Sequence, residues 1–488
     1  MNVLTDDEDT MDRPSGIEAG REIREALTRA ADTVLTSSPD GTVTRTGEDL
    51  LRRARALAGR LIERGLTGAT VGLSFRNSAA ALEAFLATEL AGATRLPVEP
   101  SAATAETRAI FDAGGARAVL TDGHHDDVRD DPTGWTSTAL GAATLVHHDA
   151  SPAPGPEWFD RVCVRAEQPL VVYPRAVRGG ELFGIPTSYA NWRAIIDINV
   201  DLHRAGGYGP PLAAGERYLT VVQLMHATGL VGSFPFLHLG LPQVLLPRFS
   251  AGAMAEAIER HRITTVFAVP GMLSRVADAV GDPGRLASLR RVLYGGAPVE
   301  TAELARLHRV FGGTLCQLYG RYEAGWPLTV LSPDDHGRLL AGDEQVAGTC
   351  GRPVPAVDLR IVGGEVRTRS PMVSPAFADV DGWCRLGDTA ELTGVGYLRL
   401  TGRLDGMINT GSFHVYPDEV EEVVLTHPAV TAVRVTGVAD PRWGETVAAY
   451  VVTTDPAVGT TLREWLRDRL APYKVPTVVH VVDRLPHH

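Results

Sequence analysis

Short apolar runs of strand length alternate along this chain with longer amphipathic stretches, and this alternation limits its fold more than any other feature. Residues 48–65, EDLLRRARALAGRLIERG, place leucine and alanine at helical spacing and end on glycine. An apolar run follows at Val71–Phe75, and then a second helical stretch at 79–91. Such alternation predicts parallel sheets covered on both faces by helices. Further strands are expected at Ala118–Thr121, Leu170–Tyr173, Leu219–Gln223, Val244–Leu246, Thr265–Val269 and Arg291–Tyr294.

The last third of the chain has a different character. Residues 342–400 are rich in glycine, proline and short apolar runs, which predicts a small β-barrel or sheet. Beyond Arg403 we expect a compact βαββα-like unit, whose helix begins at Pro417 and stops before Pro428. One core does not comfortably organise 488 residues. We therefore expect a disordered tail over 1–20, an N-terminal domain over 21–403 and a small α+β C-terminal domain over 404–488.

Composition narrows the classes of function. The formal net charge is −12 and no basic run occurs, which argues against nucleic acid or an anionic membrane as a partner. The N-terminus is acidic and lacks the apolar core of a signal peptide. The four cysteines are scattered without a CxxC pair, so neither a disulfide framework nor a zinc site is predicted. A cytoplasmic protein is the expectation.

One lysine, Lys474, stands among 47 basic residues, and all the others are arginines. A bias toward GC-rich codons explains this scarcity simply. Whatever its origin, no chemistry specific to lysine is available outside position 474.

The segment from Cys384 to Val452 carries the strongest motifs. It contains RLGD, GRLD, YPDEVEEV and GVADPRWGE, and upstream segments read MHATGLVG, YGGAPVE and LYGRYEAG. In this order and spacing they closely resemble the adenylate-forming superfamily of acyl- and aryl-CoA synthetases, peptide-synthetase adenylation domains and luciferases. The resemblance implies an N-terminal domain of two α/β subdomains plus a β-barrel, and a mobile small domain hinged at Asp405. The active site would lie between them.

The resemblance assigns roles to three charged residues. Asp388 is expected to bind the AMP ribose, because a carboxylate accepts hydrogen bonds from vicinal hydroxyls; an aspartate capping a turn is the alternative. Arg403 is expected to be a catalytic residue that contacts ribose or phosphate oxygens. An interdomain salt bridge is the alternative. Glu323 matches the family's catalytic, magnesium-binding glutamate, and a solvated loop acid is the alternative.

Other motif residues would surround the nucleotide and the acid. The resemblance places Gly295, Gly296, Ala297, Tyr319 and Tyr322 at the nucleotide, although the family prefers threonine where Tyr322 stands. His226 matches a position beside the acyl pocket and is expected to be catalytic, with a buried core histidine as the alternative. MHATGLVG lacks the aspartate that holds the ammonium group in amino-acid-activating relatives. An acyl or aryl acid without an α-amino group is therefore the expected substrate.

The family's phosphate loop, TSGTTGxPKG, has no clear counterpart. The corresponding segment runs from Tyr173 to Pro186, without the hydroxyl cluster or the lysine, and Glu181 adds a negative charge. Like charges about 4 Å apart repel by about 4 kcal/mol at an effective dielectric constant near 20. Either a rebuilt loop binds triphosphate through Arg175 and Arg178 beside Gly179 and Gly180, or triphosphate binding is lost.

Two more departures concern the small domain. PYKVPTVVHVVDRLPHH ends at His488, and the resemblance places the family's catalytic lysine beyond it. Asn409 stands where CoA ligases usually carry lysine, and GSF replaces SGF. The resemblance implies AMP or ATP, Mg²⁺, and CoA or a carrier-protein phosphopantetheine as ligands.

Three hypotheses remain open. The first is an adenylate-forming ligase of secondary metabolism, which passes an acyl group through acyl-AMP to a thiol or amine. The second is ATP-independent transfer or condensation from a preformed acyl-adenylate or acyl thioester. The third is a non-catalytic relative that binds a partner adenylating enzyme or a carrier protein.

Overall fold

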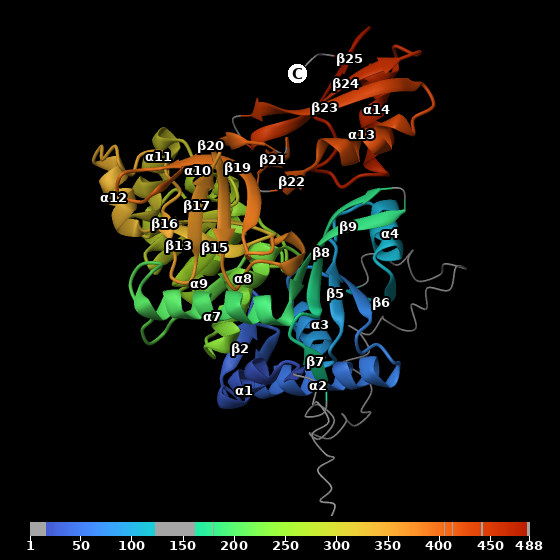
Figure 1. Ribbon diagram of the computed structural model, residues 1–488. Coiled ribbons are helices and arrows are strands. Elements are labelled where there is room, and N and C mark those ends of the chain that lie inside the picture. The colour runs from blue at the N-terminus through green and yellow to red at the C-terminus, as the bar shows by residue number, and fades with distance from the viewer. Residues whose placement is uncertain are drawn as a thin grey trace, which may run out of the picture.

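The computed structural model describes residues 16–122, 162–178, 180–404, 406–411, 413–440 and 443–485. The chain forms a large lobe and a small C-terminal lobe, and Figure 1 shows β22 and α13 of the small lobe facing the β8 and β9 end of the large one. Helix α13 (Pro417–Leu425) contacts β8 (Pro169–Arg178) directly. Asp405, the expected hinge, lies outside the described residues.

The first α/β sheet of the large lobe is parallel except at its edge. Its strand order is β6–β4–β5–β8–β9, with β9 antiparallel to β8. Helices α3 and α4 pack on it, and α2 packs on α3. The elements are β4 (Thr70–Ser74), β5 (Thr94–Pro97), β6 (Ala116–Thr121), β9 (Glu181–Ser188), α1 (Arg21–Arg29), α2 (Gly47–Glu63), α3 (Ala79–Leu90) and α4 (Thr104–Ala113).

The second α/β sheet has the order β16–β15–β14–β13–β12–β10–β11–β2–β3. Strands from β14 to β2 run parallel, and β15, β16 and β3 extend the edges antiparallel. The strands are β2 (Val34–Ser37), β3 (Thr44–Thr46), β10 (Tyr218–Thr220), β11 (Gln243–Leu245), β12 (Thr265–Ala268), β13 (Arg291–Gly295), β14 (Leu315–Arg321), β15 (Gly325–Leu331) and β16 (Arg352–Pro353).

Helices cover this second sheet, as the alternation of strands and helices predicts. They are α7 (Tyr189–Ala205), α8 (Ala227–His238), α9 (Ala251–His261), α10 (Pro270–Ala279), η2 (Pro283–Leu286), α11 (Thr301–Phe311) and α12 (Pro333–Leu340). The predicted α/β class is therefore confirmed, and each strand expected from the sequence is present within a few residues of its predicted bounds.

The segment rich in glycine and proline forms an antiparallel sheet in the order β17–β18–β19–β20, at the place expected for a small barrel or sheet. Its elements are β17 (Asp358–Val362), β18 (Glu365–Arg369), η3 (Pro375–Phe377), β19 (Cys384–Leu392) and β20 (Leu398–Arg403). Near the start of the chain, β1 (Gly16–Glu18) pairs with β7 (Cys163–Arg165), inside the stretch expected as a tail.

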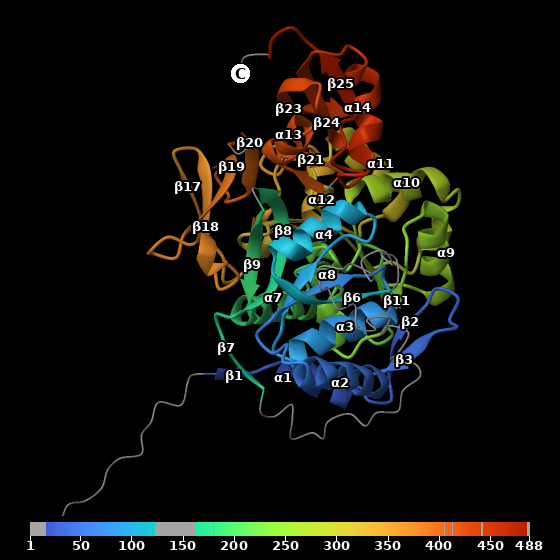
Figure 2. The same ribbon diagram turned by 90° about the vertical axis from the view of Figure 1, so that its right-hand side faces the viewer.

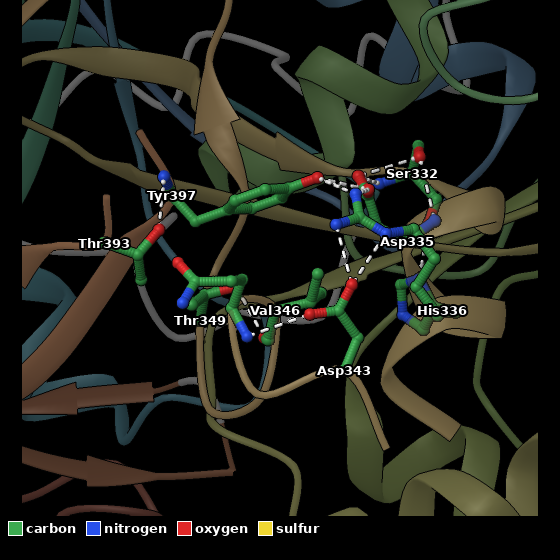
Figure 3. Close-up of polar contacts among 10 residues, drawn as sticks. Ser332, Asp335, His336, Asp343, Val346, Thr349, Thr393 and Tyr397 are labelled. Carbon is green, nitrogen blue, oxygen red and sulfur yellow. Dashed lines mark hydrogen bonds and ion pairs between the residues drawn. The ribbon is translucent and has the colours of Figure 1, made fainter. Parts of the chain in front are cut away.

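A polar cluster fastens α12 against this sheet (Figure 3). Ser332 and Asp335 form the capping box of α12, which satisfies N–H groups of the first turn. The Tyr397 hydroxyl donates to Asp335 Oδ1 at 2.5 Å. Thr349 Oγ1 donates to the Val346 carbonyl at 2.8 Å in the loop before β16. These bonds fix the wall that Leu339 and Thr349 give to the cavity described below.

The small lobe has its own hydrophobic core, as expected for a separate α+β unit. Its strands follow the order β22–β21–β24–β23, and β25 pairs with β24. Figure 2 shows this lobe at the top of the view, with α1 and α2 of the large lobe at the bottom. Buried residues such as Val435, Val447 and Leu462 pack between this sheet and its helices. The elements are β21 (Ile408–Thr410), β22 (Phe413–Val415), β23 (Val430–Asp440), β24 (Gly444–Thr453), α14 (Val458–Arg467) and β25 (Val478–Val481).

In the described part of the chain, no helix combines the length and the apolar character that a bilayer crossing requires.

Candidate active site between the lobes

A cavity of about 470 Å³ opens between the ends of β13 and β14, the β19–β20 hairpin and the small lobe. It lies at the carboxyl ends of parallel strands, where open α/β sheets commonly bind ligands. Residues from both lobes line it, among them Gly296, Ala297, Tyr319, Arg321, Asp388, Arg403, Asn409 and His414. We call it the nucleotide cavity, after the ligand that the sequence resemblance assigns to residues in its wall.

The glycines after β13 hold two backbones close together. A Cβ at Gly295 would lie 2.3 Å from the Leu318 carbonyl oxygen, so any side chain there would force β13 and β14 apart. Gly296 has φ +86°, a conformation that favours glycine. Its carbonyl accepts a 2.5 Å hydrogen bond from Asn409 Nδ2 of the small lobe. Gly296 and Ala297 line the nucleotide cavity, whereas Gly295 does not.

Asp388 lies within β19, so it is not a capping residue in a loop. Its side chain is buried, and Oδ2 accepts a 2.6 Å hydrogen bond from the Tyr319 hydroxyl. Oδ1 lies 3.7 Å from both Arg321 Nη1 and Arg403 Nη1, beyond the range of a good hydrogen bond. Burial and the Asp388 charge hold the pKa of Tyr319 well above its usual value, so this hydroxyl stays a donor.

Glu323 is also buried, so it is not a solvated loop acid. Its carboxylate lies 3.6 Å from Arg321 Nε and 3.8 Å from Arg175 Nη1. The Arg175 guanidinium in turn stacks 3.7 Å from the centre of the Tyr416 ring of the small lobe. Arg321 thus links Glu323 to Asp388, and Arg175 links Glu323 to the small lobe.

Glu323 offers one carboxylate to a magnesium ion, and Mg²⁺ is commonly held by one or two protein carboxylates together with substrate phosphates. Two guanidinium groups lie 3.6 and 3.8 Å from this carboxylate. No group of three or more histidine, cysteine, aspartate or glutamate side chains suited to a metal occurs among the described residues.

The segment in place of the phosphate loop is a β-hairpin. The pairing of β8 with β9 continues to Arg178 and Glu181, which leaves only residues 179 and 180 for the turn. Gly180 has φ +84° there. Gly179 and the side chain of Arg178 lie outside the described residues, so of the arginines expected near phosphate only Arg175 can be placed.

A second cavity, of about 160 Å³, adjoins the nucleotide cavity, and five phenylalanine, tyrosine and tryptophan rings contribute to its wall. It shares Gly296, Trp326 and His414 with the nucleotide cavity. Its other lining residues include Gln223, His226, Phe249, Met272, Arg275, Tyr322, Phe413 and Trp443. We call it the acyl cavity, because it is lined by His226, which the sequence resemblance places beside the acyl pocket.

A third cavity, of about 90 Å³, lies between the lobes and shares His226, Tyr322 and His414 with the acyl cavity. We call it the interlobe cavity. His226 Nε2 lies 2.9 Å from Glu99 Oε2, and both side chains line this cavity. His414, from β22, borders all three cavities.

The single lysine closes one side of the interlobe cavity. Lys474 Nζ donates to Glu106 Oε1 of α4 at 2.7 Å and to Glu419 Oε1 of α13 at 2.5 Å. Burial opposes the charged form of Lys474, but the carboxylates of Glu419 and Glu106 outweigh it and hold the pKa of Lys474 well above its usual value. The ammonium group therefore joins the two lobes as a charged bridge.

Several residues lie elsewhere than expected, or were missed. Tyr322 borders the acyl and interlobe cavities, not the nucleotide cavity, and its ring packs 5.0 Å from that of Tyr173. Glu99, Arg321 and His414 were not singled out from the sequence. Glu99 follows β5 at the carboxyl edge of its sheet, and this position was a usable signal.

Family models match most of the chain. The model of the AMP-binding enzyme family matches residues 23–171 and 184–373, and that of the AMP-binding enzyme C-terminal domain matches 419–488. The gap between the first two ranges, 172–183, falls on the turn and flanking strands of the β8–β9 hairpin.

Relatives and solved structures agree with these matches. A feruloyl-CoA synthase from Amycolatopsis sp is 33% identical over 92% of this chain and 93% of its own length. The structure of the amide bond synthetase McbA from Marinactinospora thermotolerans is 30% identical, with a TM-score of 0.78 over 95% of this chain and 96% of that one. A malonyl-CoA ligase, in a ternary product complex with methylmalonyl-CoA and AMP, is 27% identical, with a TM-score of 0.76 over 95% of this chain and 99% of that one.

Proposed function

This chain belongs to the AMP-binding enzyme family, and we propose that it activates a carboxylic acid as an acyl-adenylate and transfers the acyl group to a thiol or amine. The observation that carries this proposal is the junction of the nucleotide and acyl cavities at Gly296, Trp326 and His414. A single molecule made of AMP joined to an acyl group would occupy both cavities at once.

The nucleotide cavity suits a nucleoside monophosphate. Asp388 would accept hydrogen bonds from the ribose hydroxyls through Oδ1, because Tyr319 already occupies Oδ2. Arg403 and Arg321 would offset the charge of the phosphate, and guanidinium groups bind phosphate oxygens well. The adenine would lie against the flat backbone at Gly296 and Ala297.

The acyl cavity favours an aromatic acid. Phe249, Trp326, Phe413 and Trp443 supply rings that pack well against another ring. The guanidinium of Arg275, 4.8 Å from the centre of the Phe249 ring, borders this cavity but not the nucleotide cavity. It would therefore meet the far end of the acid, where an oxygen substituent would accept its hydrogen bonds.

Arg175 is the residue best placed to supply the positive charge of the missing phosphate-loop lysine. It stands in β8 beside Glu323, and stacking on Tyr416 holds it while the small lobe lies in this arrangement. Movement of the small lobe would release the guanidinium toward the phosphates of ATP. Electrostatic stabilisation of the departing pyrophosphate would then fall to arginine.

A second candidate, transfer from an acyl-adenylate supplied by another protein, draws support from the hairpin. Its turn of two residues provides little backbone to wrap a triphosphate, and Glu181 adds a negative charge next to it. The nucleotide and acyl cavities would serve this reaction equally well.

ATP–pyrophosphate exchange with a panel of aromatic and aliphatic acids separates the two candidates. Exchange that depends on an aromatic acid supports the ligase. No exchange, with AMP release from synthetic aryl-AMP on addition of an acceptor, supports transfer alone. Inactivity in both assays rejects both.

A further inference from the structure

The interlobe cavity holds a buried carboxylate oxygen that lacks a hydrogen-bond donor. Within the described residues, Oε2 of Glu106 is buried and accepts no hydrogen bond, and the buried Oε2 of Glu99 has the His226 imidazole 2.9 Å away without the alignment of a hydrogen bond. Both side chains line the cavity, and that of Glu106 is only 9% exposed. Lys474 occupies just the other oxygen of Glu106. Buried acceptors without donors are costly, so a ligand that donates hydrogen bonds would bind here favourably.

The chemistry of these groups distinguishes an amine from a thiol. A protonated primary amine brings three N–H donors and a positive charge, whereas a thiol brings one weak donor and no charge. The carboxylate of Glu99 contacts the His226 imidazole through Oε2 and accepts a 3.3 Å hydrogen bond from Ser101 Oγ through Oε1, so its contacts are a histidine and a hydroxyl rather than an arginine or lysine. An ammonium group would supply the charge and the donors that this end of the cavity lacks.

Glu99 and His226 also form a proton-accepting pair. Because the Glu99 carboxylate only accepts, Nε2 of a neutral His226 carries the proton toward it, and Nδ1 is the basic nitrogen. The 2.9 Å contact is poorly aligned for a hydrogen bond, which is common before a substrate binds. Since His226 borders the acyl cavity as well, it stands between an acceptor and the acyl group.

We propose that the acceptor of this enzyme is an amine, bound in the interlobe cavity against Glu99 and Glu106, and that Glu99 positions His226 as the base for its attack. This proposal rests on the acyl-adenylate function proposed above. The amine arrives as an ammonium ion and loses one proton to water. Its nitrogen lone pair attacks the acyl carbon, the C–N bond forms, and the C–O bond to AMP breaks. AMP leaves as the anion, and His226 takes the second nitrogen proton, which gives a neutral amide.

The test bypasses ATP. The full chain receives a synthetic aryl-AMP with either ethylamine or CoA, and mass spectrometry follows amide, thioester and AMP over pH 6 to 9. Glu99→Gln and His226→Asn are compared with wild type, and Glu25→Gln, an exposed change on α1, is the matched control. Binding of a hydrolysis-resistant acyl sulfamoyl adenosine and the thermal midpoint establish that each variant is folded.

We expect wild type to form amide faster than thioester. E99Q should lower amide turnover about 100-fold and raise the KM for ethylamine, because general base catalysis contributes about 100- to 10,000-fold. H226N should flatten the pH dependence of turnover, with analogue binding kept in both variants. Preferential thioester formation, or E99Q turnover equal to wild type with the analogue still bound, would overturn the amine proposal alone. A wild-type protein that neither binds the analogue nor accelerates either product would overturn the acyl-adenylate function with it.

Discussion

Lys474 Nζ lies 2.7 Å from Glu106 Oε1, and this contact joins the small lobe to the large one through the single lysine of the chain. The lysine side chain is only 6% exposed, and Glu419 supplies a second carboxylate from the small lobe itself. The bridge spans the boundary across which the small domain of this family is expected to move.

Replacing the lysine should loosen the lobes. Lys474→Met removes the cation that Glu106 and Glu419 share, and breaking a buried ion pair in this way costs about 3–5 kcal/mol. We expect a lower thermal midpoint and a larger radius of gyration by small-angle X-ray scattering. Arg463→Met, an exposed change in α14, is the control. A K474M protein as compact and stable as R463M would contradict the bridge.

The ion pairs of Lys474 with Glu106 and Glu419 should also persist at alkaline pH. The pKa of Lys474 is raised, so its contribution to stability is fully present below the pKa of an unfolded lysine, about 10.4. It is lost only as pH rises through the higher folded value. The radius of gyration should therefore stay constant from pH 7 to 10. Expansion of wild type within that window, matching K474M, would show that the pKa of Lys474 is not raised.

Mildly acidic pH should destabilise the protein through buried histidines. Burial lowers the pKa of His336 to about 4 and that of His238 to about 4, so the unfolded chain binds more protons between pH 4 and 6.5. Stability should fall as pH drops through this window, by at most about 1.4 kcal/mol per pH unit for each histidine. Urea denaturation at pH 5, 6 and 7 measures this slope. His336→Gln should reduce it, whereas the exposed change His480→Gln should not; equal slopes would contradict the assignment.

Asp388 should decide AMP affinity. Asp388→Asn removes the charge that would accept the ribose hydroxyls, and hydrogen bonds to charged groups contribute about 1.5–3 kcal/mol. We expect AMP affinity measured by calorimetry to fall about 10- to 100-fold. Tyr319→Phe, which only frees Oδ2, should cost less. The exposed change Asp381→Asn is the control. Equal AMP affinity in D388N and D381N would show that Asp388 does not contact AMP.

Arg175 should matter for ATP and little for AMP. Arg175→Ala removes the guanidinium beside Glu323, and losing one group that stabilises charge in the transition state often costs about 100- to 1000-fold. ATP–pyrophosphate exchange should therefore drop by that factor, while AMP affinity stays close to wild type. Exposed Arg165→Ala is the matched control. Undiminished exchange in R175A would show that another group stabilises the phosphates of ATP.

The sequence allowed the architecture and the motif residues that line one cavity to be predicted, because both are local patterns. The periodicity of strands and helices depends on residues close together in the sequence. Asp388 and Arg403 fall in contiguous motifs, and the pairing of β19 with β20 brings the two residues opposite each other. Contacts across the lobes were not predictable in this way. Glu106 meets the cavity only because α4 faces the small lobe, and no short motif indicates that packing.

The conformation of the phosphate-loop segment could not be predicted from the local sequence either. Its composition indicated a lost or rebuilt loop, but pairing of β8 with β9 up to Glu181 depends on register, which single residues do not reveal. Likewise, Tyr322 was assigned to the nucleotide from its motif, whereas its ring packs toward Tyr173 and Trp326.

Calorimetry with an acyl sulfamoyl adenosine built on an aromatic acid tests the joined cavities most directly. Because one molecule would fill the nucleotide and acyl cavities together, it should bind at least about 100-fold tighter than AMP and be displaced by AMP. D388N should lower the affinity for the analogue by about the same factor as the affinity for AMP, because both ligands place a ribose at Asp388. Affinity no better than that of AMP, or simultaneous binding of AMP and the analogue, would contradict a shared acyl-adenylate site.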